Sequence, residues 1–369
     1  MSDIFLEPTT TDTGSIDDTE PTSPAWMAVF SLAMGVFGLL TAEYLPASLL
    51  TPMAAGLGVS EALAGQAVTV TAVIAMFSGL LTATLTRQID RRIVLLAFSL
   101  LMIASNLLAA LSSSLIVLLA MRVLLGIALG GFWSMAAAVA MRLVPAALLP
   151  RALSIIFSGI SVATVVAVPL GSYLGGLYGW RTAFFAAAAL GVVTLAFQFC
   201  TLLPLKPHSP ARLGTILDVL RRPGIGVGML CCTLVHTGQY ALFTYIRPVL
   251  ESVMVINVSG LALVLLAFGV ANFVGTLAAG WILERSLRAT LVVMPVLIGG
   301  ASLGLILLPT GITGQVLLVI LWGMAFGGVP VAWSNWVAHA VPDQAESARV
   351  EWSWSPYSQP LRLVLLWVV

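Results

Sequence analysis

Ten long apolar runs constrain this chain more than any other feature of its sequence. A helix needs roughly 20 mostly apolar residues to cross a bilayer, and each run comes close to that length. Charged residues make up only 8% of the chain, whereas they make up about 25% of a soluble domain. The sequence therefore predicts an all-α membrane protein with spanning helices at about 26–49, 62–85, 93–111, 115–141, 152–177, 182–204, 223–247, 258–282, 289–309 and 313–338.

The runs fall into two groups on either side of a polar segment. Residues 26–204 hold six runs and predict an N-terminal six-helix bundle, whereas residues 223–338 hold four more, which we interpret as the start of a second bundle. Between them, residues 205–222 carry Leu and Ile at helical spacing, as expected of a cytoplasmic linker lying on the membrane surface. Residues 1–25 are acidic, lack Lys and Arg, and predict a disordered cytoplasmic tail.

The pattern of apolar runs stops near the C-terminus. Residues 339–369 are rich in Trp, Ser and Pro and contain no clean run of about 20 apolar residues. An architecture of two six-helix halves needs two more helices here. We therefore expect the chain to lack helices eleven and twelve, and we interpret residues 339–369 as an atypical, frameshifted tail.

The basic residues predict how the helices are oriented. Lys and Arg are enriched in cytoplasmic loops of membrane proteins. The predicted spans place only Arg181 and Arg247 on one side of the membrane, and the other side receives Arg87, Arg91, Arg92, Arg142, Arg151, Lys206, Arg212, Arg221, Arg222, Arg285 and Arg288. The N-terminus is therefore expected to be cytoplasmic.

Two charged residues lie inside apolar runs. Glu43 is in the first run and Arg122 in the fourth, and at 1.5 Å per residue both lie roughly 10 Å below the outer surface. A charge within a membrane span is costly and is therefore a candidate for function. We interpret Glu43 and Arg122 as a proton-coupling pair. The alternative is that each side chain extends to the nearby surface.

Aromatic and amide side chains within the runs suggest a ligand cavity. Trp133 shares a helix face with Arg122, and Trp333 and Asn335 lie in the tenth run. Aromatic rings and amides can stack on and hydrogen-bond a planar ligand. Interfacial aromatic belts and hydrogen bonds between helices are the competing explanations. The predicted cavity set is Trp133, Trp333, Asn335, Gln239, Tyr240 and Asn272.

Several classes of function lack support in the sequence. Motifs such as HExxH, GxSxG and the P-loop are absent, and so is a pair of carboxylates, so we expect no enzyme activity. The three cysteines lie in or beside apolar runs without metal-ligand spacing, so we expect no metal and no cofactor. No basic cluster is large enough to suggest nucleic acid. The expected partners are membrane lipid, protons and a small molecule.

Three motifs resemble those of the major facilitator superfamily, within its proton-coupled exporters. RVLLG (122–126) resembles the motif whose Arg serves proton coupling, and VPLGSYLGG (168–176) resembles the antiporter motif, with Pro169, Gly171 and Gly175 packing helices. TRQIDRR (86–92) resembles the gating loop, which assigns gating roles to Asp90, Arg91 and Arg92. The resemblance implies two pseudo-repeated bundles. The pairing of ALGGFWS (128–134) with AFGGVPVAWS (325–334) suggests the same repeat, and a chance match between Gly-rich helices is the alternative.

Longer stretches resemble the members of this family that export purine ribonucleosides. They include EYLPASLLTPM (43–53), PLGSYLGGLYGWR (169–181) and WGMAFGGVPVAWSNW (322–336). The resemblance implies a monomer in the bacterial inner membrane that moves inosine and guanosine outward in exchange for protons. Two alternatives remain: a broader drug or sugar exporter of the same family, or a truncated remnant that inserts without transporting.

Overall fold

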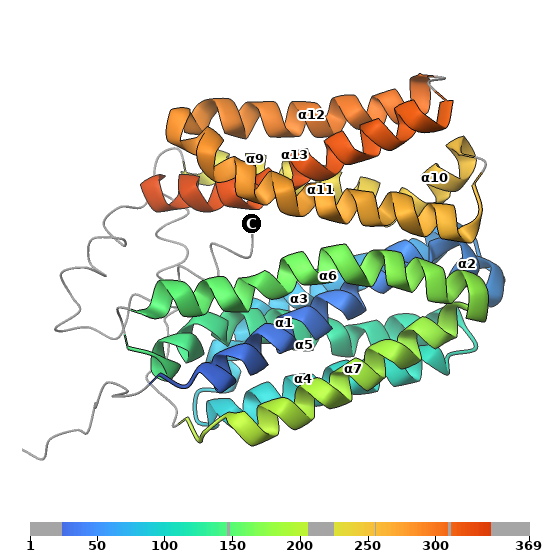
Figure 1. Ribbon diagram of the computed structural model, residues 1–369. Coiled ribbons are helices and arrows are strands. Elements are labelled where there is room, and N and C mark those ends of the chain that lie inside the picture. Colours follow the sequence, from blue (N-terminus) through green and yellow to red (C-terminus); the bar gives the residue numbers. More distant parts are fainter. Residues whose placement is uncertain (1–23, 146–147, 206–224, 255, 309–310, 341–369) are drawn as a thin grey trace, which may run out of the picture.

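The computed structural model describes residues 24–145, 148–205, 225–254, 256–308 and 311–340 (Figure 1). The acidic tail up to residue 23, the linker from residue 206 and the chain from residue 341 lie outside these described residues. Predictions that fall on those segments, including the frameshifted tail, are therefore not addressed by the structure.

Helices of the N-terminal half cover most of residues 26–201. Six of them are long and apolar enough to cross a membrane, and short α2 directly follows α1. Ordered along the chain, they are α1 (Trp26–Ser48), α2 (Leu50–Leu57), α3 (Glu61–Leu85), α4 (Arg91–Ala110), α5 (Leu115–Leu143), α6 (Leu149–Tyr178) and α7 (Trp180–Thr201).

The described part of the C-terminal half holds four further helices of spanning length, so that the described residues contain ten in all. Short α10 follows α9 as α2 follows α1. The elements are α9 (Ile225–Thr244), α10 (Ile246–Val253), α11 (Val258–Arg285), α12 (Leu287–Leu307) and α13 (Gly311–Ala340). The ten predicted spans are therefore confirmed, with ends that differ by a few residues.

Polar residues define where several helices begin. Ser60, Ser114, Asn257 and Ser286 each accept a hydrogen bond from a backbone N–H three residues further on, at the starts of α3, α5, α11 and α12. Such N-caps satisfy donors that the first turn of a helix leaves without a partner. The chain therefore turns back into the membrane at positions that its own side chains specify.

Glycines show the internal repeat directly. Gly126 and Gly130 of α5 pack against backbone carbonyls of α3, so closely that an added Cβ would collide with them. Gly323 and Gly327 of α13 pack in the same way against carbonyls of α11. Small residues allow such close helix approach within lipid. Because the two helix pairs share residue spacing and packing, the halves are related repeats.

The two halves meet along α1, α6 and α11. Gly269 of α11 packs on the backbone of Thr164 and Val165 in α6. Tyr44 of α1 meets Phe243 of α9 edge to face, with ring centroids 5.3 Å apart. Helix α1 is the most enclosed span, with 78% of its apolar window buried, against 22% for α3. A charge carried by α1 therefore lies at the centre of the molecule.

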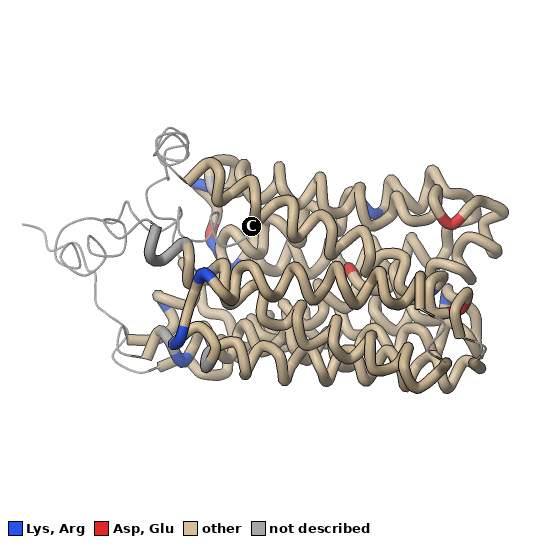
Figure 2. The backbone as a smooth tube through the Cα atoms, turned by 90° about the horizontal axis from the view of Figure 1, so that it is seen from above, with Lys and Arg blue, Asp and Glu red and all other residues tan. Residues whose placement is uncertain are grey.

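Figure 2 shows that Lys and Arg residues gather at one end of the bundle. We call this the basic end; it holds the start of α4 with Arg91 and Arg92 and the end of α5 with Arg142. The opposite end holds the junction of α1 and α2 together with Arg247 of α10, and we call it the Arg247 end.

Candidate functional site

Arg122 is anchored on a backbone carbonyl that a proline leaves free. In a regular helix the Ala42 carbonyl would accept a hydrogen bond from the backbone N–H of residue 46. That residue is Pro46, which lies inside α1 and has no N–H. Arg122 of α5 donates from Nη1 to the Ala42 oxygen at 3.0 Å. The local sequence of α1 therefore creates the acceptor that holds the guanidinium.

The Arg122 side chain is fully buried, with 0% exposure. Its guanidinium also lies over the ring of Phe184 in α7, 4.7 Å from the ring centroid. A cation above an aromatic face is stabilised by the ring's quadrupole. The carbonyl and the ring hold Arg122 in the interior, so it does not extend to the surface.

Glu43 lies beside this arginine, in the centre of the protein. It is 9% exposed and close enough to Arg122 for an electrostatic interaction. No hydrogen bond joins the carboxylate to the guanidinium, whose Nη1 donates to the Ala42 carbonyl. Glu43 Oε2 has no hydrogen-bond partner among the described residues, nor do Arg122 Nε and Nη2. The pair therefore retains polar atoms that another molecule can engage.

Four aromatic rings form a chain through the interior and across the two halves. Tyr44 of α1 contacts Phe243 of α9, which contacts Phe268 of α11 at 5.7 Å between ring centroids. Phe268 in turn meets Trp322 of α13 edge to face at 5.2 Å. These buried rings form a continuous aromatic contact between four helices, and we call the interior around them and the Glu43–Arg122 pair the central region.

The side-chain amide of Gln239, in α9, is held in one orientation by Trp322. It is 1% exposed, and its Oε1 accepts a hydrogen bond from Trp322 Nε1 at 2.8 Å. An indole nitrogen can only donate, so the amide oxygen faces Trp322 and the amide nitrogen points elsewhere. Gln239 Nε2 has no hydrogen-bond partner in the described part of the chain. Leaving a buried donor unsatisfied costs about 1–3 kcal/mol.

Tyr240, the residue after Gln239 in α9, lies near Tyr44 and Glu43. It is partly buried, its side chain interacts with Tyr44, and it lies near enough to Glu43 for an electrostatic interaction. Of the predicted cavity residues, Tyr240 therefore lies near Glu43, and Gln239 precedes it in α9 and contacts Trp322 of the aromatic chain. The aromatic partners Tyr44, Phe243 and Phe268 were missed by sequence reasoning, because aromatic residues in an apolar run look alike.

The two predicted tryptophans contact aromatic rings outside the chain of four. Trp133 is 2% exposed and stacks on Phe157 of α6, with ring centroids 5.8 Å apart. Trp333 is 6% exposed and meets Trp336 edge to face. The burial of both residues within the protein differs from the exposed position of an interfacial belt.

The two remaining predicted cavity residues are amides of the C-terminal half. Asn335 is partly buried, and Asn272 is 8% exposed, on the face of α11 that packs against α13. A metal site has no support in the described residues, because three or more His, Cys, Asp or Glu side chains do not gather at any place there.

The predicted gating residues form hydrogen bonds with other described residues of the N-terminal half. Asp90 caps α4 by accepting from Arg92 N at 2.8 Å, and it also accepts from Leu205 N at 2.9 Å. Arg91 donates to the Thr86 side chain, and Arg92 donates to the Phe199 carbonyl. This cluster ties the α3–α4 loop to the end of α7 at the basic end.

The glycines of the predicted antiporter motif face α1. A Cβ added at Gly171 would lie 2.7 Å from Leu45 and 2.8 Å from Ser48 Oγ, and one added at Gly175 would collide with Leu49. Pro169 lies two residues earlier, inside α6. The motif thus lets α6 approach α1 at the Arg247 end.

The comparisons with known proteins agree with this architecture. The model for the Major Facilitator Superfamily matches residues 26–349. Purine ribonucleoside efflux pumps named NepI, from Salmonella enteritidis PT4 and Salmonella typhimurium, are each 46% identical to this chain over 326 residues. The matched region covers 88% of this chain and 82% of each pump.

Solved structures share the fold. A D-xylose-proton symporter superposes with a TM-score of 0.69 at 16% identity, covering 93% of this chain and 86% of the symporter. A mutant of the nucleoside transporter NupG superposes with a TM-score of 0.65 at 14% identity, covering 91% and 87%. With the family match over most of its length, the chain is a multi-pass membrane protein that belongs to the major facilitator superfamily, a family of transporters and not of enzymes.

Proposed function

We propose that the chain is a proton-coupled antiporter that exports purine ribonucleosides such as inosine and guanosine. The observation that carries this proposal is the pair of unsatisfied polar atoms in the central region, Gln239 Nε2 and Glu43 Oε2. Both are buried near a chain of aromatic rings. The names of the relatives at 46% identity support the same substrate class.

A purine nucleoside carries the hydrogen-bonding groups and the planar ring that can bind the unpaired polar atoms and the aromatic rings of this region. Its planar base can pack against aromatic rings, which favour stacked or edge-to-face contacts. Its ring nitrogens and 6-oxo group can accept a hydrogen bond from Gln239 Nε2, and its ribose hydroxyl groups can donate to Glu43. Asn272, Trp333 and Asn335 extend the proposed cavity along α11 and α13.

Proton coupling is assigned to Glu43 with Arg122. An ionised Glu43 has a buried oxygen without a partner, which is unfavourable in a water-poor interior. Protonation removes the charge and makes the carboxyl group a donor. We propose that substrate and proton bind alternately, because each satisfies the same carboxyl group, and that Arg122 stabilises the ionised form.

The proposed direction of transport depends on which end of the helix bundle faces the cytoplasm. We propose that the basic end faces the cytoplasm and that the Arg247 end faces outward, in line with the enrichment of Lys and Arg in cytoplasmic loops. In a bacterial inner membrane, inward proton flow through a monomer would then drive nucleoside outward, as the central region opens to each side in turn.

The test is uptake of labelled inosine into everted membrane vesicles under an imposed pH gradient, since everted vesicles turn export into uptake. We expect saturable uptake that collapses when the gradient is dissipated. Glu43→Gln is expected to abolish gradient-driven uptake while leaving membrane insertion unchanged.

Glu61→Gln is the matched control, because Glu61 lies in the first turn of α3 at the end of the bundle, away from the centre. It is expected to transport normally. Full gradient-driven uptake by Glu43→Gln would remove Glu43 from coupling. Uptake of a drug or sugar that excess inosine fails to compete would contradict the substrate assignment.

A further inference from the structure

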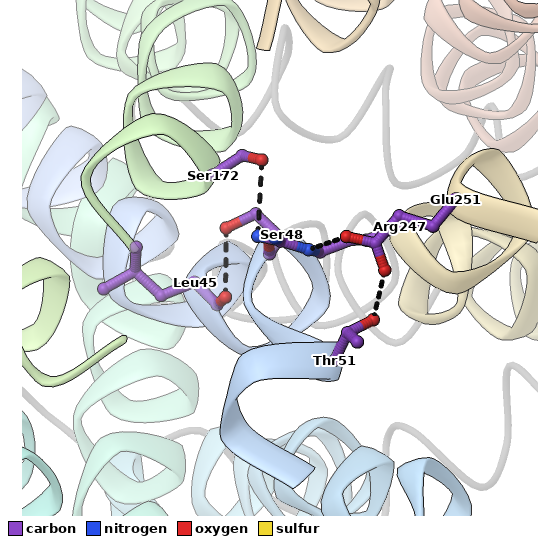
Figure 3. A network of polar contacts seen from close by, with 6 residues as sticks. All are labelled: Leu45, Ser48, Thr51, Ser172, Arg247 and Glu251. Carbon is purple, nitrogen blue, oxygen red and sulfur yellow. Dashed lines mark hydrogen bonds and ion pairs between the residues drawn. The ribbon is translucent and has the colours of Figure 1, made fainter. Parts of the chain in front are cut away.

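A polar cluster around the buried Arg247 joins the two halves at the Arg247 end (Figure 3). Arg247 of α10 is 5% exposed and donates from Nη1 to the Ser48 carbonyl at 3.0 Å, with Ser172 Oγ at 3.5 Å. Its Nε donates to Glu251 Oε1 at 2.8 Å. The other oxygen of Glu251 accepts from Thr51 Oγ1 at 2.7 Å. We call these five residues the Arg247 cluster.

The cluster connects elements that are far apart in sequence. Arg247 and Glu251 belong to α10 of the C-terminal half, whereas Ser48 and Thr51 lie on either side of the α1–α2 junction and Ser172 lies in α6. Figure 3 shows Arg247 extending from α10 to that junction. At the basic end, by comparison, Asp90 accepts from Leu205 N, a contact between described residues that lies within the N-terminal half.

The acceptor for Arg247 is prepared by the sequence of the junction. In a continuous helix the Ser48 carbonyl would accept from the backbone N–H of residue 52. That residue is Pro52, which has no N–H, and the helix is interrupted at Leu49. The Ser48 carbonyl is therefore open to a donor from outside the helix, in the same way that Pro46 opens the Ala42 carbonyl to Arg122.

Because Arg247 is buried, its side chain depends on protein partners instead of water. A guanidinium removed from water needs partners for its charge and its N–H groups, and Arg247 obtains them from both halves. Separation of the halves at this end would take Ser48, Thr51 and Ser172 away from α10. Glu251 would remain with Arg247, since the two lie one turn apart on the same helix.

We propose that Arg247 is a latch: its cluster holds the Arg247 end closed and must break each time that end opens during transport. The proposal rests on alternating opening of the two ends, which the proposed function requires, but it does not depend on which substrate is carried. Arg247 acts as a positioning residue, because it contacts α1 and α6 at the bundle end and lies outside the central region.

A disulfide across the same end can measure closure without any substrate. A Cβ added at Gly176 of α6 would lie 3.3 Å from Val258 Cβ in α11, close to the separation of about 3.5–4.5 Å in disulfides. The parent protein would carry Gly176→Cys and Val258→Cys, with Cys200, Cys231 and Cys232 replaced by Ala. Mild oxidation is expected to cross-link it rapidly.

The latch predicts that Arg247→Gln slows this cross-linking by about threefold or more, because losing hydrogen bonds to a charged group shifts the equilibrium toward the open end. Arg181→Gln is the control: Arg181 lies at the same end, but it donates to the Ser112 carbonyl within the N-terminal half. It is expected to cross-link at the parent rate.

Two further variants keep the test decisive if Arg247→Gln fails to insert. Thr51→Val removes only the hydroxyl that binds Glu251, and Pro52→Ala restores a backbone N–H that competes for the Ser48 carbonyl. Each is expected to slow cross-linking to a smaller extent. Parent-rate cross-linking in every inserted variant would overturn the latch. If the parent protein does not transport inosine but its Arg247→Gln variant still cross-links more slowly than the parent, the latch is supported and only the substrate assignment is contradicted.

Discussion

Trp322 fixes the orientation of Gln239 by donating from Nε1 to its amide oxygen at 2.8 Å. Trp322→Phe keeps an aromatic ring next to Phe268 but removes the donor, so the amide is free to turn its oxygen toward the ligand. We expect inosine affinity to fall roughly fivefold, which corresponds to about 1 kcal/mol for one hydrogen bond. Competition of unlabelled inosine against labelled inosine uptake measures this change.

Trp26→Phe is the control for that experiment, since Trp26 lies at the basic end beneath Arg151. It should leave the apparent affinity for inosine unchanged. An unaltered affinity in Trp322→Phe would show that the Gln239 amide does not contact the ligand.

Arg122→Lys tests whether the geometry of the buried cation matters beyond its charge. Lysine keeps the positive charge but lacks the planar group that lies over Phe184 and bonds to Ala42. We expect gradient-driven inosine uptake to fall about tenfold or more, through the loss of a hydrogen bond and a cation–π contact. The amount of protein in the membrane should stay the same.

The chain contains a matched control for this substitution. Arg181 also lies over an aromatic ring, that of Trp180 at 4.3 Å, and also donates to a backbone carbonyl, that of Ser112. Because this second arginine lies at the bundle end, Arg181→Lys should retain transport. If Arg122→Lys and Arg181→Lys lose inosine uptake to the same extent, Arg122 contributes to folding and not to transport.

Pro46→Ala tests the origin of the Arg122 site. Alanine restores a backbone N–H at position 46, which can then donate to the Ala42 carbonyl and compete with Arg122. We expect slower inosine uptake with unchanged or improved thermal stability, because a proline within a helix is destabilising. Pro295→Ala, in the interior of α12, should improve stability without slowing transport. Normal uptake by Pro46→Ala would show that the proline does not control Arg122.

The spanning helices could be predicted from the sequence, because each helix that crosses the lipid needs its own long run of apolar residues. Long apolar runs predicted α3, α5 and α11 within a few residues, and Ser60 or Asn257 marks where such helices begin. The short helices α2 and α10, which follow the interruptions at Leu49 and Tyr245, were not predicted. The first predicted span ends at residue 49 and the seventh at residue 247, so α2 lies beyond the first span and most of α10 lies beyond the seventh.

The site was harder to predict because its contacts join distant segments. Glu43 and Arg122 stood out as charges in apolar runs, and the structure places them side by side. The sequence also shows that Pro46 lacks an N–H, but not that Arg122 would use the carbonyl left free. Phe243 and Phe268 gave no local signal, because only the packing of α9 against α1 and α11 brings their rings together.

Gly130→Ala tests the close packing that holds each half together. A Cβ at this position of α5 would collide with the Ala75 carbonyl of α3, and backbone cannot move aside as a side chain can. We expect a loss of about 1–3 kcal/mol in stability, as for overpacked cores, measured as a lower temperature of thermal aggregation in detergent. Gly299→Ala in α12 meets open space and should be neutral or stabilising, since Ala favours helix by about 1 kcal/mol over Gly. A Gly130→Ala protein as stable as the Gly299→Ala protein would show that α3 and α5 are less tightly packed than their glycines indicate.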